Sequence, residues 1–181
     1  MEGMTSDLVE SKPPQRLLWL VLTVAAGIIV LDQITKYWAA TSMKDRLESG
    51  GGAIEVVGSF LRFTYAENTG AAFSIGTGFT WIFTSIAIIV VIVIIRTASR
   101  LTSPAWAVAL GGLLGGSTGN LIDRMTRDPG PFRGYVVDFI QFPNFPIFNI
   151  ADMAIVGSSI LMVFLSLRGV EFTRDVSRVS A

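Results

Sequence analysis

The chain has 181 residues, of which 51% are hydrophobic and 15% are charged, and its 14 basic residues balance 14 acidic ones. Ordinary globular domains contain about 25% charged residues, so this chain is unusually poor in charge. The length predicts a single domain, residues 1–181, and the balanced charge favours no nucleic-acid partner. The sequence lacks histidine and cysteine, which excludes Ser-His and Cys-His catalysis, disulfides, and zinc held by histidine or thiolate.

Four long apolar segments predict a membrane protein that is mainly α-helical. A helix needs about 20 apolar residues to cross a hydrocarbon core of about 30 Å. The segments are 17–35, 79–95, 101–122 and 153–167. We expect the first to be a retained helix and not a cleaved signal peptide, because the bulky Trp38 spoils the small-residue cleavage site that such a peptide needs.

Four spans place both ends of the chain on the same side of the membrane. The tails, 1–15 and 169–181, and the short link 96–100 carry basic residues at high density near the span ends. Basic residues near span ends favour the cytoplasmic side. We therefore expect both tails on the cytoplasmic side of the membrane.

Two segments between the spans, 41–78 and 123–148, are then expected on the outer side. In the first, the stretch 54–65 is rich in β-forming residues, its part 61–65 alternates apolar and polar residues with a period of two, and Gly58-Ser59 is suited to a hairpin turn. These features predict a small amphipathic sheet on the membrane surface. The second contains prolines that exclude a long helix and aromatic residues that suit a loop resting in the membrane interface.

Carboxylates cluster at the outer ends of the predicted spans. Asn120 and Asp123 are three residues apart, as are Asn149 and Asp152, so each pair shares a helix face. The fourth span holds only about 15 apolar residues, roughly 22 Å of helix, which draws its first turn inside the membrane boundary. Asp32 lies at a similar depth in the first span. Ionisable groups at such depth face the bundle interior or a wet cavity.

Each of these carboxylates also has a structural interpretation. Asp32 and Lys36 form an i,i+4 pair, and Asp123 followed by Arg124 is a common polar helix end. Asp152 suits the first turn of a helix, where the dipole favours a negative charge. Asp138, in an apolar and aromatic run, has no obvious local partner.

Two carboxylates in one pocket of low dielectric predict acid–base chemistry without histidine, metal or any other cofactor. Both cannot ionise cheaply, so one keeps its proton near neutral pH. The ionised member then activates water, and the protonated member donates to a carbonyl oxygen, which hydrolyses a peptide bond. From the residues alone, three carboxylates remain candidates for the two roles: Asp123, Asp138 and Asp152.

The glycine-rich segment 111–119 has a structural interpretation. It lacks the lysine of a phosphate-binding loop, and small residues in a membrane span allow helices to approach closely. Three rival functions remain at this point. They are a transporter or proton pathway, a non-catalytic assembly factor, and a Ser–Lys protease that would use Lys36.

Five motifs in order carry a resemblance to a known family. They are Asp32-Gln33-Ile34-Thr35-Lys36, Asn68-Thr69-Gly70-Ala71-Ala72-Phe73, Gly116 to Arg124, Val137-Asp138-Phe139, and Phe148-Asn149-Ile150-Ala151-Asp152. Together they span 32–152 and resemble the bacterial lipoprotein signal peptidases (signal peptidase II). The resemblance implies four transmembrane helices with an extracytoplasmic β-cradle from 41–78 and an outer loop from 123–148.

The resemblance also implies an aspartic endopeptidase that cleaves prolipoproteins just before a diacylglyceryl-modified cysteine. Its catalytic pair maps to Asp138 and Asp152. The residues that line the pocket or hold substrate and pair map to Asp32, Lys36, Asn68, Gly70, Asn120, Asp123, Arg124 and Asn149. Membrane lipid and lipidated precursors are the expected partners, a monomer suffices, and no metal or cofactor is expected.

Overall fold

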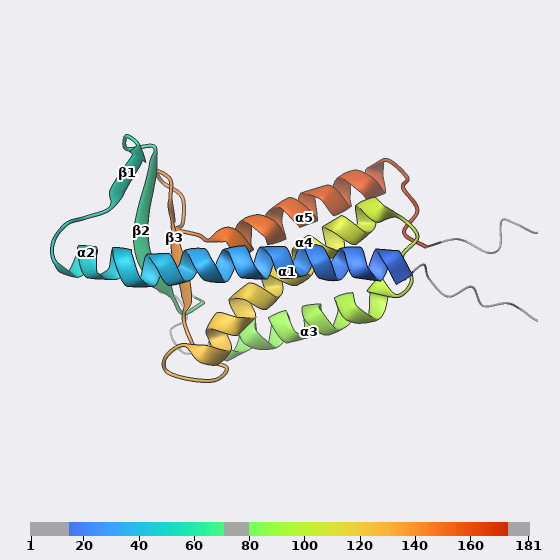
Figure 1. Cartoon of the computed structure of the whole chain (residues 1–181), viewed down its shortest axis with the longest axis horizontal. Helices are drawn as coiled ribbons and strands as arrows, with labels where there is room; N and C mark the ends of the chain where they lie inside the picture. The colour runs from blue at the N-terminus through green and yellow to red at the C-terminus, as the bar shows by residue number, and fades with distance from the viewer. Residues whose placement is uncertain (1–14, 71–79, 174–181) are drawn as a thin grey trace, which may run out of the picture.

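The computed structural model describes residues 15–70 and 80–173, which form a bundle of helices with a small sheet at one end (Figure 1). Helix α1, Gln15–Trp38, continues through a π-helical turn, Ala39–Met43, into the short helix α2, Lys44–Glu48. This helix extends well into the segment 41–78, which we expected to lie outside the first span. It ends where Gly50 adopts a φ of 81°, a conformation that a glycine allows.

Three further long helices follow. They are α3 (Thr80–Ala98), α4 (Pro104–Thr126) and α5 (Ile150–Leu167). Their bounds lie within a few residues of the predicted spans, although Phe79 of the second span falls outside the described residues. Three helices of the described chain are long and apolar enough to cross a membrane: α3, α5 and the continuous helix Arg16–Glu48 that α1 forms with α2. Helix α4 has the length but is less apolar, because glycines and polar residues fill much of it.

Helix α4 occupies the centre of the bundle, and its glycines bring its neighbours close. A Cβ atom added at Gly111, Gly115 or Gly119 would lie 2.6–2.9 Å from atoms of α1. A Cβ at Gly116, on a neighbouring face, would collide with the backbone of α5. The glycine-rich segment therefore acts in helix packing, as its sequence indicates.

The sheet has three antiparallel strands in the order β1-β2-β3, with bounds Ile54–Val57, Leu61–Asn68 and Val136–Gln141. The hairpin of β1 and β2 lies in the stretch 54–65 where the sequence predicts it, with its turn at Gly58-Ser59. The third strand corrects our expectation that 123–148 is only a loop. It was missed because apolar residues stand on both of its faces, so the run does not alternate; nearly all of β3 is buried.

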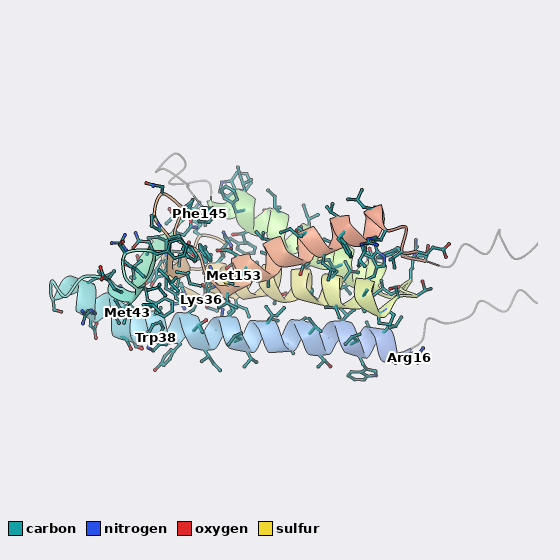
Figure 2. The ribbon with its side chains drawn as sticks, turned by 90° about the horizontal axis from the view of Figure 1, so that it is seen from above. Arg16, Lys36, Trp38, Met43, Phe145 and Met153 are labelled. Atoms are coloured by element: carbon teal, nitrogen blue, oxygen red, sulfur yellow. The ribbon has the colours of Figure 1, made fainter. Side chains whose placement is uncertain are left out.

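The sheet stands against the continuation of α1, as Figure 1 shows. Ala39 and Met43 of that helix pack with Val137, Phe139 and Ile140 of β3. Figure 2 places Lys36 and Met153 toward this sheet end of the bundle and Arg16 at the opposite end. The described chain begins and ends at the end opposite the sheet (Figure 1). Of the predicted tails, 1–14 and 174–181 lie outside the described residues.

Candidate active site

Most of the polar side chains singled out in the sequence come together at the sheet end of the bundle. They come from helices α1 and α4, strand β3 and the start of α5. Six of these side chains are almost fully buried: Asp32, Lys36, Asn120, Asp123, Asp138 and Asn149. Asp152 and Arg124 are partly buried. Buried charges at this density require partners, and the hydrogen bonds supply them.

Lys36 holds the centre of this cluster. Its Nζ lies 2.9 Å from Asp32 Oδ2 and 3.0 Å from Asp123 Oδ2, and it donates to Asn120 Oδ1 at 2.8 Å. The i,i+4 pair of Asp32 and Lys36 is therefore present, and Lys36 also joins α1 to α4. Asp123 forms ion pairs with Lys36 and, at 2.9 Å, with Arg127. It therefore belongs to a buried ion-pair network and is not simply a polar residue at the end of a helix.

Asp32 and Asp123 each accept a backbone hydrogen bond beside one candidate catalytic residue. The amide of Ala151, which precedes Asp152, donates to Asp32 Oδ1 at 2.9 Å. The amide of Val137, which precedes Asp138, donates to Asp123 Oδ2 at 3.1 Å. The ammonium of Lys36 thus balances two carboxylates that fix the backbone of both segments.

Asn149 joins the two candidate catalytic carboxylates directly. It is the N-cap of α5. Its side-chain Oδ1 accepts a hydrogen bond from the backbone amide of Asp152 at 2.9 Å, and its backbone amide donates to Asp152 Oδ2 at 3.2 Å. Its Nδ2 donates to Asp138 Oδ1 at 2.6 Å. Asn120 completes the arrangement by donating to Asp152 Oδ1 at 2.8 Å. The start of α5 and the middle of β3 are therefore held together.

Asn68, at the end of β2, provides the second donor to Asp138, at 2.8 Å. The backbone amide of Gly70 donates to Asn68 Oδ1 at 2.8 Å and fixes this side chain. Gly70 has a φ of 94°, and a Cβ there would lie 2.6 Å from the ring of Phe83. A glycine is therefore required on both counts. The rest of this motif, 71–73, lies outside the described residues.

The electrostatics of the site separate Asp138 from an ordinary carboxylate. Burial, followed by repulsion from Asp152, raises the pKa of Asp138 from 3.8 to about 7, although hydrogen bonds from Asn68 and Asn149 oppose the rise. Arg124 lies within electrostatic reach of Asp152, Asp138 and Asp123. It donates from Nη1 to the carbonyl of Asn120 at 3.3 Å, while its buried Nε has no partner among the described residues.

Two side chains of the cluster were not among the candidates from sequence. Gln33 donates to Asp32 Oδ2 and to the carbonyl of Gly119, each at 3.1 Å. Arg127 binds Asp123 from the loop that follows α4. The i,i+4 spacing of Asp123 and Arg127 could have indicated this ion pair, but only the adjacent Arg124 was considered as a neighbour of Asp123 in the sequence. Among the described residues, no group of three or more acidic side chains is arranged to hold a metal ion.

The chain is similar to known proteins in sequence and in fold. The family model described as signal peptidase (SPase) II, in peptidase family A8, matches residues 24–168. The lipoprotein signal peptidase of Mycolicibacterium smegmatis is 49% identical over 92% of this chain and 68% of its own length. That of Mycobacterium avium is 46% identical over 94% of this chain and 91% of its own length.

A solved structure of a bacterial membrane enzyme superposes with a TM-score of 0.70 at 34% identity, covering 83% of this chain and 94% of the other. The apolar helices, the buried acidic cluster and these matches define the chain as a membrane protease. It belongs to the signal peptidase II family, whose members process prolipoproteins.

Proposed function

We propose that this chain removes the signal peptide from diacylglyceryl-modified prolipoproteins by cutting just before the lipidated cysteine, with Asp138 and Asp152 as its catalytic pair. The observation that carries this assignment is the double role of Asn149. The same side chain donates to Asp138 and caps the helix turn that holds Asp152. Asp123, the third candidate, is instead engaged by Lys36, Arg127 and the amide of Val137. A buried carboxylate that is engaged by two cations and a backbone amide suits a supporting role.

The raised pKa of Asp138, about 7, suggests how the roles divide. At neutral pH the pair shares one proton, and Asp138 carries it for much of the time. Asp152, in its ionised form, takes a proton from water, and the oxygen of that water attacks the carbonyl carbon. Asp138 donates its proton to the carbonyl oxygen. When the tetrahedral intermediate collapses, Asp138 takes back a proton from one of its two hydroxyl groups and the C=O bond re-forms. The C–N bond breaks at the same time, and the new carboxyl group of Asp152 protonates the leaving amine.

Arg124 is suited to stabilising negative charge that develops during this reaction. Its guanidinium is partly buried between the aspartates, and its Nε has no partner among the residues described. A pre-oriented donor in a site of low dielectric favours the transition state over the substrate. We therefore assign Arg124 to substrate or oxyanion binding.

The place of the site fits a substrate that is anchored by lipid. The acyl chains of a diacylglyceryl cysteine stay in the bilayer, so the bond before that cysteine must be cut near a membrane boundary. We propose that α1, α3, α4 and α5 all span a bacterial cytoplasmic membrane, with the sheet end outside and both chain ends in the cytoplasm. The pair comes from one chain, so a monomer suffices.

The arrangement favours a protease over the alternatives considered from sequence. A proton pathway needs ionisable groups at several depths, but Asp32, Asp123 and Asp152 of the described spanning helices are linked to one another through Lys36, Asn120 and the Ala151 amide. A Ser–Lys protease needs a serine beside its lysine. The side chains that contact Lys36 Nζ here are Asp32, Asp123 and Asn120.

The proposal is tested with purified protein and a synthetic precursor, prepared with and without its diacylglyceryl group. Only the lipidated precursor should be cleaved, and Asp138→Asn or Asp152→Asn should each lower kcat by at least about a thousandfold. Asp45→Asn, a matched change at an exposed position of α2, should cleave normally. Activity retained in either variant of the pair removes that residue from the catalytic role, and equal cleavage of both precursors contradicts the substrate assignment.

A further inference from the structure

Charged groups around the aspartate pair come close to cancelling one another. Among the described residues, four carboxylates and three cations interact in the buried cluster around this pair: Asp32, Asp123, Asp138, Asp152, Lys36, Arg124 and Arg127. If the pair holds one proton, three negative and three positive charges remain. A buried cluster of this kind is most stable when its net charge is zero, because uncompensated charge in low dielectric is costly.

Arg127 is the outermost cation of the cluster, and no role in the proposed reaction has yet been assigned to it. Its Nε lies 2.9 Å from Asp123 Oδ1, and its side chain is 20% exposed while that of Asp123 is 1% exposed. The other oxygen of Asp123 faces inward, to Lys36 and to the amide of Val137. Arg127 therefore holds the outward side of the carboxylate that anchors the backbone beside Asp138.

The loop after α4 is folded so that it keeps Arg127 in this place. The amide of Gly134 donates back to the carbonyl of Arg124 at 3.1 Å. A Cβ at Gly134 would lie 2.6 Å from the carbonyl oxygen of Asp123, so only a glycine permits this return. The ring of Tyr135 then covers the guanidinium, with its centroid 5.8 Å from the central carbon of Arg127.

We propose that Arg127 is a positioning residue for the aspartate pair. It orients Asp123, which holds the Val137 amide and with it Asp138, and it supplies the positive charge that leaves a single proton on the pair. This inference rests on the proposed function. The charged and titratable groups that face Asp123 and Arg127 are Asp32 and Lys36 on α1, Arg124 on α4, Asp138 on β3, Asp152 on α5 and Tyr135 in the loop.

Removing the charge of Arg127 leaves one excess negative charge beside the pair. Negative charge favours proton uptake, so the pair should bind a second proton up to a higher pH and lose the ionised member that activates water. The pH profile of cleavage should therefore move to higher pH. For a charge about 10 Å away at an effective dielectric of about 20, the shift is on the order of one pH unit.

The test measures cleavage of the diacylglyceryl precursor by the purified full-length protein across the pH range. Arg127→Gln should lower kcat at neutral pH about tenfold, leave KM within about twofold, and move the profile up by about half a unit or more. Arg127→Lys should keep most of the activity and the original profile. Arg133→Gln, the same change at an exposed position of the same loop, is the control and should match the unmodified protein.

A second pair of variants separates charge from simple loss of folding. Asp123→Asn keeps an acceptor for the Val137 amide but removes a negative charge, so its profile should move to lower pH. The double variant Asp123→Asn, Arg127→Gln removes one charge of each sign and should return the profile toward that of the unmodified protein. A profile of Arg127→Gln that stays in place, or full equivalence to Arg133→Gln, overturns the inference. Failure of the unmodified protein to cleave overturns the proposed function instead.

Discussion

Lys36→Met tests whether the central ammonium holds the site together. Lys36 is fully buried and lies 2.9 Å from Asp32 and 3.0 Å from Asp123. Methionine fills a similar volume but leaves both carboxylates without this partner. Asp123 keeps Arg127, while Asp32 keeps hydrogen bonds from the Ala151 amide and from Gln33.

The expected loss follows from this difference between the two carboxylates. Removing one partner of a buried ion pair costs about 3–5 kcal/mol, because an uncompensated charge stays behind. Asp123 is still compensated, so most of the loss arises at Asp32. The double variant Asp32→Asn, Lys36→Met removes one charge of each sign and should lose about 2 kcal/mol less than Lys36→Met alone.

The measurement is equilibrium unfolding of the purified protein in mixed micelles with increasing SDS, followed by circular dichroism. Lys36→Arg, which keeps the charge, is the matched variant and should be destabilised less than Lys36→Met. A loss below about 1 kcal/mol for Lys36→Met, or a double variant no more stable than the single one, would refute the reasoning. The first result would mean that the carboxylates find other compensation. The second would mean that packing and not charge is lost.

Three further changes probe packing, capping and protonation. Gly119→Ala should destabilise the protein by about 1–3 kcal/mol in the same unfolding assay, because the new Cβ would lie 2.6 Å from Oδ2 of Asp32. Gly157→Ala is the control and should not destabilise the protein, because Gly157 has open space around it. Asn149→Ala should lower the free energy of unfolding by about 1 kcal/mol through the lost helix cap, and it should also lower kcat strongly. Ser103→Ala should leave stability nearly unchanged, because that N-cap makes no side-chain hydrogen bond. Because the pKa of Asp138 is raised from 3.8 to about 7, the folded state binds more protons than the unfolded state between these values, so the free energy of unfolding should fall as pH rises through that window. Asp138→Asn should flatten this dependence, and an unchanged slope in that variant would contradict the assignment.

The sequence by itself determined the elements that depend on local patterns. Long apolar runs predict the helices, and their expected bounds lie close to those of α3, α4 and α5. The period of two in 61–65, together with the turn at Gly58-Ser59, predicts the β1–β2 hairpin. The spacing of Asp32 and Lys36 predicts their ion pair, since i and i+4 side chains meet on any helix.

Tertiary structure alone decided which of the separated polar residues share one site and how each is engaged. Strand β3 was not predicted, because it is buried on both faces and its pairing partner, β2, lies about 70 residues earlier in the chain. The choice among three carboxylates was open from residue chemistry, since any two of them in one pocket would serve. It depends on which backbone amides and asparagines each oxygen meets, and such contacts form only when α1, α4, β3 and α5 pack together.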